Sequence, residues 1–185
     1  MHPSPFSIRR RVCMTAMLAA ALHAPASAAD RATLERDARS ALERLTATVP
    51  VAKSLAPSAK GVLVFPRITK AGFGIGAQYG DGVLFRQGRA AGFYNNSGAS
   101  YGLQAGAQQY GYAMFLMTEK AVDALAQNEG FEVGVGPSVV LMDDSMARTL
   151  STHDLKDDVY AFVFGQKGLM GGMGIQGNKI TPLKD

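Results

Sequence analysis

Side chains able to perform acid–base or nucleophilic catalysis are scarce in this 185-residue chain. It contains three histidines, and His153 is the only one beyond residue 28. His153 stands in the polar run Ser151-Thr152-His153-Asp154, which is typical of a surface loop, whereas hydrolysis needs a base held against a nucleophile. The acidic pairs Asp143-Asp144 and Asp157-Asp158 lack the ligand spacing of a calcium loop. The sequence therefore predicts no catalytic residues, no metal site and no cofactor.

One glycine-rich segment, Gly72-Phe73-Gly74-Ile75-Gly76, is superficially similar to a nucleotide-binding loop. Its third glycine comes one residue early for the dinucleotide fingerprint, and no helix is expected after it to receive a phosphate. A phosphate loop, in which glycine is followed by Lys and then Ser or Thr, is also absent from the sequence. We therefore predict that these glycines serve the backbone and do not bind a nucleotide.

Charge is concentrated in two segments of opposite sign. Residues 53–89 hold six basic residues against Asp81 alone, a balance of +5, whereas residues 117–158 hold nine acids and three bases, a balance of −6. Residues 90–118, between them, carry no formal charge. This uncharged stretch is too polar for a transmembrane helix, so we expect interior sheet, with an apolar binding surface as the alternative.

The first 28 residues have the three-part layout of a secretory signal peptide. A basic start at Arg9-Arg10-Arg11 is followed by an apolar run over residues 12–22 and a small-residue close at Ala26-Ser27-Ala28. The apolar run is too short to cross a bilayer. We therefore expect cleavage before Ala29, which leaves residues 29–185 as a single domain in the periplasm or associated with the cell envelope.

Removal of this segment changes the charge and the thiol content of the chain. The formal net charge of +4 becomes +1, because 16 basic residues then face 15 acidic ones, and this argues against a nucleic-acid partner. The only cysteine, Cys13, is lost, so disulfides and thiolate ligands are not expected. Lipidation at Cys13 and export by a twin-arginine route are the alternatives.

Three segments have helical patterns. Apolar residues spaced by three and four predict an amphipathic helix over residues 30–48, and its stripe consists of Leu34, Ala38, Ala41, Leu42, Leu45 and Val49. A short helix over residues 51–56 is expected after Pro50, because proline suits the first position of a helix. Thr118 is expected to cap a mid-chain helix over residues 119–127.

A period of two in the apolar pattern predicts strands between the helices and after them. The expected strands cover residues 61–65, 71–79, 82–86, 90–95, 101–108, 110–117, 131–141, 159–164 and 172–180. Turns are expected at Pro66, Gly80-Asp81, Gly88 and Asn96-Ser97-Gly98, and the polar stretch 143–158 is expected to be a surface excursion. The pattern predicts an α+β fold with a strongly curved, mainly antiparallel sheet, and closure into a barrel is left open.

Glycine has an architectural role in this prediction. All 21 glycines lie between Gly61 and Gly177, and many alternate along the expected strands. Such rows permit either tight curvature of the sheet or close approach of a ligand. If Gly74 touches another backbone or a bulky side chain, Gly74→Val is expected to overpack that contact.

Five blocks of sequence, spread in order over most of the chain beyond residue 28, resemble the SYLF lipid-binding domain family. They are Ala59-Lys60-Gly61-Val62-Leu63-Val64-Phe65-Pro66, Lys70-Ala71-Gly72-Phe73-Gly74-Ile75-Gly76, Ser100-Tyr101-Gly102-Leu103-Gln104-Ala105-Gly106, Phe164-Gly165-Gln166-Lys167-Gly168-Leu169-Met170 and Gly177-Asn178-Lys179-Ile180. The resemblance implies a non-enzymatic module. Similar eukaryotic domains bind phosphoinositide membranes and sometimes actin, and the bacterial relatives resemble exported envelope proteins.

For this chain the resemblance implies binding of anionic lipid or of a membrane surface. The candidate headgroup contacts are Lys60, Arg67 and Lys70, with an apolar site around Phe93 and Tyr94 as the alternative. Actin is not expected as a partner of an exported protein. Two other functions are weighed against lipid binding: an outer-membrane barrel, which the predicted helices disfavour, and a hydrolase of envelope lipid, which the single His153 disfavours.

Overall fold

The computed structural model describes residues 28–126, 131–132, 139–142 and 157–183. The signal-peptide prediction, most of the stretch 143–158 and His153 lie outside these residues. The described helices are α1 (Ala28–Thr48), α2 (Pro50–Leu55) and α3 (Glu119–Ala126). The described strands are β1 (Gly61–Arg86), β2 (Arg89–Leu116), β3 (Phe131–Glu132), β4 (Val139–Met142) and β5 (Val159–Pro182).

The strands form one sheet, in the order β1-β2-β5-β3. All neighbours in this order are antiparallel, and β4 adds to β5 in parallel. The predicted α+β class and the strongly curved, mainly antiparallel sheet are confirmed. The described strands do not close into a barrel, because β1 remains a free edge and the sheet stays open.

Three strands are much longer than the sequence pattern predicted. The β1–β2 ladder runs from Gly61 opposite Leu116 to Arg86 opposite Arg89, and it is interrupted only by register shifts. The predicted turns at Pro66, Gly80-Asp81 and Asn96-Ser97-Gly98 are therefore wrong. Pro66 is tolerated because it lies on an edge strand at a bulge, where no ladder hydrogen bond is needed. The turn at Gly88 is confirmed, and its two-residue loop has positive φ at Gln87 (50°) and Gly88 (75°).

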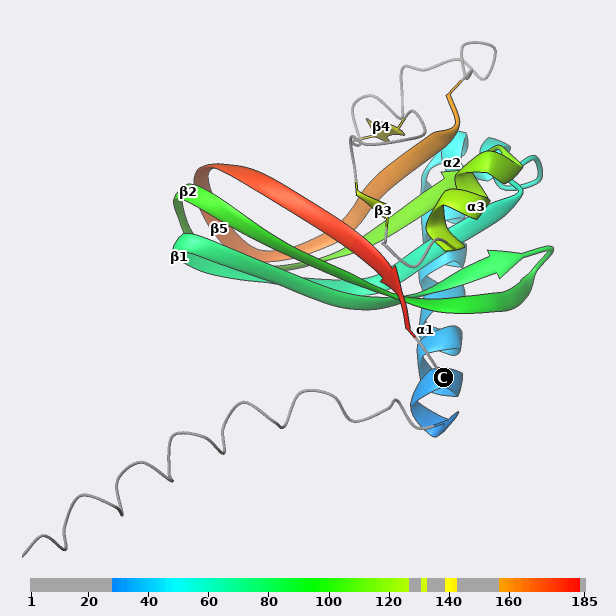
Figure 1. The fold of residues 1–185 in the computed structure, drawn as a ribbon, viewed down its shortest axis with the longest axis horizontal. Coiled ribbons are helices and arrows are strands. Elements are labelled where there is room, and N and C mark those ends of the chain that lie inside the picture. Colours follow the sequence, from blue (N-terminus) through cyan, green and yellow to red (C-terminus); the bar gives the residue numbers. More distant parts are fainter. Residues whose placement is uncertain (1–27, 127–130, 133–138, 143–156, 184–185) are drawn as a thin grey trace, which may run out of the picture.

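The three long strands fold back on themselves at one end, which we call the bend (Figure 1). Each strand carries a glycine with positive φ close to it: Gly74 in β1 (71°), Gly106 in β2 (133°) and Gly168 in β5 (96°). Such backbone angles strain other residues, so glycine lets three paired strands turn together. The bend separates a first limb (β1 61–73, β2 105–116, β5 159–169) from a second limb (β1 75–86, β2 89–101, β5 175–182).

The two limbs pack closely against each other. A Cβ on Gly82 of the second limb would lie 2.5 Å from the Phe65 ring and 2.7 Å from the Val64 carbonyl oxygen of the first. A Cβ on Gly80 would lie 2.6 Å from the Arg67 carbonyl oxygen. The tight curvature that the sequence predicted is thus explained by glycines, which let one strand lie directly against another. The contact on which the expectation for Gly74→Val depends is absent, because a Cβ on Gly74 would meet nothing within 4 Å.

Helices cover the sheet on two sides. Helix α1 packs mainly against β1, and its buried residues Ala38, Ala41 and Leu45 belong to the predicted apolar stripe. The α1 and α2 core includes Val64, Phe115 and Phe162, whereas the opposite core, under α3, includes Phe65, Tyr112 and Met114.

The helix ends follow the predicted signals. Pro50 occupies the start of α2. The Ala121 N–H donates to Thr118 Oγ1 at 3.2 Å, which is the predicted N-cap of α3. Helix α1 also contacts the β1–β2 turn. Arg39 of α1 donates to the Gly88 carbonyl and its guanidinium lies over the Phe85 ring, so the turn is held against the helix.

Candidate functional site

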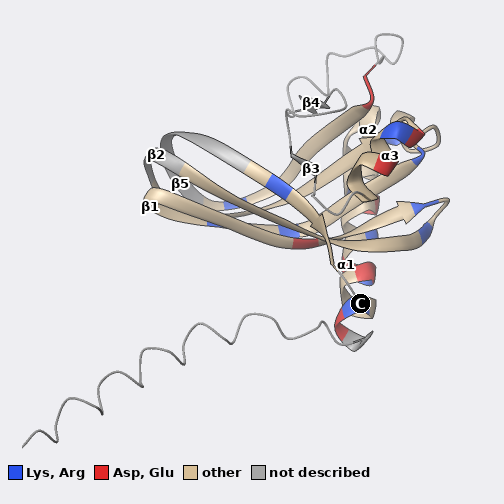
Figure 2. Ribbon diagram, viewed as in Figure 1, with Lys and Arg blue, Asp and Glu red and all other residues tan. Residues whose placement is uncertain are grey.

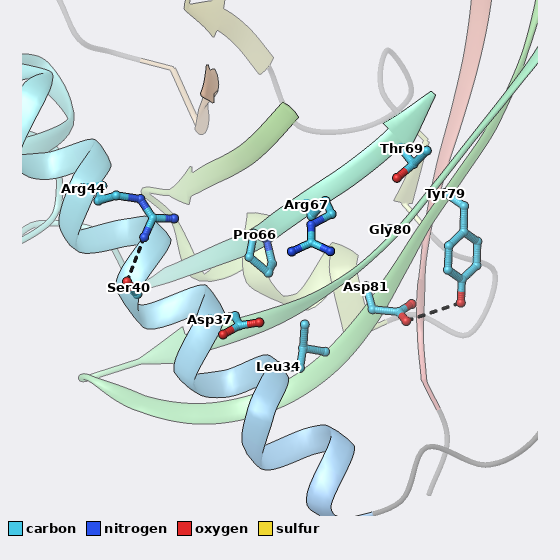
Figure 3. Close-up of a pocket in the computed structure, with 10 residues that line it drawn as sticks. All are labelled: Leu34, Asp37, Ser40, Arg44, Pro66, Arg67, Thr69, Tyr79, Gly80 and Asp81. Atoms are coloured by element: carbon cyan, nitrogen blue, oxygen red, sulfur yellow. Dashed lines mark hydrogen bonds between the residues drawn. The ribbon is translucent and has the colours of Figure 1, made fainter. Parts of the chain in front are cut away.

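Two adjoining hollows lie between α1 and the sheet, beside the first limb. The first, about 440 Å³ in volume, is lined by Leu34, Asp37, Ser40, Arg44, Pro66, Arg67, Thr69, Tyr79, Gly80 and Asp81 (Figure 3). The second, about 320 Å³, is lined by Arg44, Pro66, Arg67, Gln109, Tyr110, Gly111, Phe164, Gly165 and Lys167. They share Arg44, Pro66 and Arg67 in their linings, and we call the two adjoining hollows together the groove.

The two hollows differ in charge. Two arginines and the carboxylates of Asp37 and Asp81 line the first, so its formal charges balance. Arg44, Arg67 and Lys167 line the second, and no acidic residue does. We call the second hollow the cationic hollow. Its three positive charges come from α1, β1 and β5, so the tertiary fold is needed to assemble it.

The backbone of the cationic hollow is shaped by a bulge. The β2–β5 ladder shifts register between Gln109 and Gly111, and Gly165 beside it has a φ of 61°. A Cβ on Gly111 would collide with the Phe164 ring, so glycine is required for that ring to lie against β2. The bulge thereby sets the position of Lys167, which pairs in register with Gln109 across from Thr69.

Hydrogen bonding orients the arginine on the helix. Arg44 Nη1 donates to Ser40 Oγ at 2.8 Å, one helical turn away. Figure 3 shows Arg44 projecting from α1 and Arg67 projecting from β1 beside Pro66, towards the space between the helix and the sheet. Two guanidinium groups and an ammonium group around one hollow supply the donors that bind phosphate-type anions.

The tyrosines of the groove do not reduce its positive charge. Burial raises the pKa of Tyr110, so its phenol stays neutral at physiological pH. Burial, and secondarily the Asp81 carboxylate, raise the pKa of Tyr79, whose hydroxyl donates to Asp81 Oδ2 at 3.4 Å. Asp81 also accepts from Asn95 Nδ2 at 2.8 Å, so this carboxylate is held on the β1–β2 ladder.

The structure separates the three basic residues predicted as headgroup contacts. Arg67 lies in the groove, where both hollows meet. Lys60 precedes β1 at the end of the sheet furthest from the bend, and seven residues of strand put it roughly 23 Å from Arg67. Lys70 is half-buried near the bend and, by strand alternation, points to the face opposite Arg67. These three residues therefore do not form a single cluster.

The two predicted apolar contacts belong largely to the protein's own packing. Tyr94 is 6% exposed and sits in the core under α3, and burial raises the pKa of its phenol. Phe93 is half-buried, and the Arg31 guanidinium lies 5.2 Å from its ring centroid. A ligand at this place would have to compete with Arg31 for the Phe93 ring.

Two residues of the cationic hollow were not predicted. Arg44 is one of several charged residues on α1, and helical periodicity does not distinguish it from its neighbours. Lys167 lies in a block that carried the family resemblance, but nothing in the sequence shows that β5 brings it beside Arg67.

The described residues include no cluster of His, Cys, Asp and Glu that could hold a metal ion. None of the described helices is both long and apolar enough to span a membrane.

Comparison with known proteins finds a matching family for the C-terminal part of the chain. Residues 97–185 match the model of the Ysc84 family, described as Las17-binding protein actin regulators. The match covers most of β2, all of α3 and β5, and therefore Lys167 of the cationic hollow. No curated protein matches the chain. Through residues 97–185 the chain is similar to the Ysc84 family, the SYLF family that its sequence resembles.

Proposed function

We propose that the protein binds anionic lipid at a membrane surface, with the cationic hollow as the headgroup site. The observation that carries the proposal is the gathering of Arg44, Arg67 and Lys167 around a hollow of about 320 Å³ with no acidic residue in its lining. A lipid phosphate accepts charge-assisted hydrogen bonds from such donors, and guanidinium groups suit its geometry.

The family supports a binding role. Its description names binding and regulation and no reaction. The described part of the chain also lacks a cluster of metal-ligating side chains. Lipid binding uses the groove as the structure has it, since a headgroup needs charge and space and no reactive side chain. An anionic phospholipid headgroup is the chemical class we propose, in the envelope of the cell that exports the protein.

Charge reversal in the hollow tests the proposal. Arg67→Glu/Lys167→Glu should weaken binding to vesicles of mixed anionic and neutral phospholipid by at least tenfold, because each basic residue near an anionic surface contributes about 1 kcal/mol. Co-sedimentation measures the binding. Wild-type binding should fall as salt rises, and it should be weak on neutral vesicles.

A matched control separates this site from net charge. Lys53→Glu/Lys120→Glu makes the same change in charge at two exposed helix positions outside the groove. We expect it to bind within about threefold of wild type, since exposed charges at a distance are screened. If both double variants lost binding equally, general attraction would replace the hollow as the explanation.

The envelope location depends on removal of the N-terminal segment. We expect the exported protein to begin at Ala29, because Ala26-Ser27-Ala28 supplies the small residues that processing requires. N-terminal sequencing of the protein recovered outside the cytoplasm measures this. Recovery of a chain that still carries Arg9-Arg10-Arg11 would contradict both the cleavage and the proposed location.

A further inference from the structure

The bend presents large apolar side chains to solvent. Phe73 is 88% exposed and Ile75 is 68% exposed, on either side of Gly74 in β1. The other large hydrophobic residue that is exposed in the described part of the chain, Tyr79, has its hydroxyl engaged by Asp81. Exposure of two neighbouring large apolar residues opposes folding in water, so it points to a partner that covers them.

Gly74, between Phe73 and Ile75, is exposed at the bend. Gly74 has a φ of 71°, and a Cβ built on it would meet nothing within 4 Å. Ala105 pairs in register with Phe73, and Ala105, Gly106 and Ala107 on β2 are small and exposed, so they leave Phe73 uncovered. Neither hollow is lined by Phe73 or Ile75. An exposed apolar tip that lines neither hollow suits a deformable apolar phase.

The distribution of charge around the bend identifies that phase. No charged residue occurs between Lys70 and Asp81 on β1, after Arg89 on β2, or between Lys167 and Lys179 on β5. The coloured part of the bend in Figure 2 accordingly carries neither blue nor red. An uncharged tip through three paired strands is compatible with the acyl region of a bilayer, where charge is costly.

Basic residues border this uncharged tip on the first limb. The charged residues nearest the bend there are Lys70 on β1 and Lys167 on β5, at adjacent levels of the register. Lys70 lies three residues, or roughly 10 Å of strand, behind Phe73. On the second limb the nearest charges are mixed, since Lys179 pairs in register with Glu132 and Asp81 follows on β1. Positive charge behind an apolar tip matches a bilayer whose headgroups are anionic.

We infer that the bend enters an anionic bilayer, with Phe73 and Ile75 among the acyl chains and Lys70 and Lys167 at the headgroups. The inference rests on the proposed membrane binding and extends it from headgroup contact to insertion. Strand alternation puts Phe73 on the same exposed face of β1 as Arg67, about six residues or roughly 20 Å away. The first limb therefore carries Phe73 of the apolar tip and lines much of the cationic hollow.

A single tryptophan provides a direct reporter, because the chain contains none. The exported form of the protein, which begins at Ala29, carries Phe73→Trp and is mixed with vesicles of phosphatidylglycerol and phosphatidylcholine. We expect its emission to shift to shorter wavelength and to be quenched by phospholipids brominated in their acyl chains. Ala47→Trp, at an exposed position of α1, should show neither change.

A double serine variant keeps the inference testable if tryptophan disturbs the tip. Phe73→Ser/Ile75→Ser should reduce vesicle binding at least tenfold while the remaining binding stays sensitive to salt, because only the apolar contribution is removed. Both side chains are exposed, so circular dichroism should show an unchanged fold.

The outcomes distinguish insertion from surface binding. If Phe73→Trp co-sediments with vesicles without a blue shift or quenching, the tip does not insert and the headgroup proposal stands alone. If the serine variant binds as tightly as wild type, insertion is overturned in the same way. If wild type does not bind anionic vesicles at all, the proposed function and the insertion fall together.

Discussion

Gly82→Val should lower the free energy of unfolding by about 3 kcal/mol, one of the two largest effects expected from a single substitution in this protein. A Cβ at this position would lie 2.5 Å from the Phe65 ring and 2.7 Å from the Val64 carbonyl oxygen. Phe65 is fully buried, and the carbonyl belongs to the backbone of the opposing limb, so neither can withdraw cheaply. Chemical denaturation of the variant and of wild type measures the difference.

Ala77→Val is the matched control for Gly82→Val. Ala77 lies in the same strand and limb, and its side chain is exposed. Valine is favoured in strands, so the free energy of unfolding should change by no more than about 0.5 kcal/mol. Equal stability of Gly82→Val and Ala77→Val would show that the two limbs do not pack as closely as described here.

Gln78→Leu is the second substitution with a large expected effect. Gln78 is 4% exposed, and its Nε2 donates to Asn178 Oδ1 at 2.9 Å and to Asn96 Oδ1 at 3.2 Å. Its Oε1 accepts from the Tyr110 hydroxyl at 3.0 Å, which links the second limb to the first. Leucine leaves these polar groups without their partner, so we expect the free energy of unfolding to fall by about 2–3 kcal/mol.

A double-mutant cycle with Tyr110→Phe isolates the hydrogen bond between the limbs. Tyr110→Phe removes the hydroxyl that Gln78→Leu would leave unpaired, so the double variant should lose less stability than the two single variants added together. Thermal or chemical denaturation of all four proteins measures the coupling. Additive losses would mean that the Tyr110 hydroxyl and Gln78 do not stabilise one another.

The polar network and the glycine contacts explain how so few residues build a strongly folded sheet. The limbs approach through Gly80 and Gly82, where only glycine fits, and Gln78, Asn96 and Tyr110 fill the space nearer the bend. Helix α1 packs mainly against β1 and supplies Arg44 to the groove. The bend and the cationic hollow are thus two consequences of the same folding back of β1, β2 and β5.

The sequence alone was sufficient for the local structure. The stripe from Leu34 to Val49 predicted the buried face of α1, Pro50 predicted the start of α2, and Thr118 predicted the cap of α3. These features depend on residues within a few positions of one another, through helical periodicity or a single hydrogen bond. The same is true of the α+β class, since alternation within each strand does not depend on what the strand packs against.

The tertiary structure decided where the strands end and which charges meet. Asn96 and Gly80 have the residue types of a turn, yet both lie inside long strands. Asn96 is fully buried there and accepts from Gln78, and the opposing limb leaves no room for a Cβ at Gly80. Arg44, Arg67 and Lys167 are distant in sequence, and only the packing of α1 on β1 and the β5 bulge bring them to one hollow. The sequence shows that these three charges are present, but their positions in space depend on long-range contacts that no local pattern encodes.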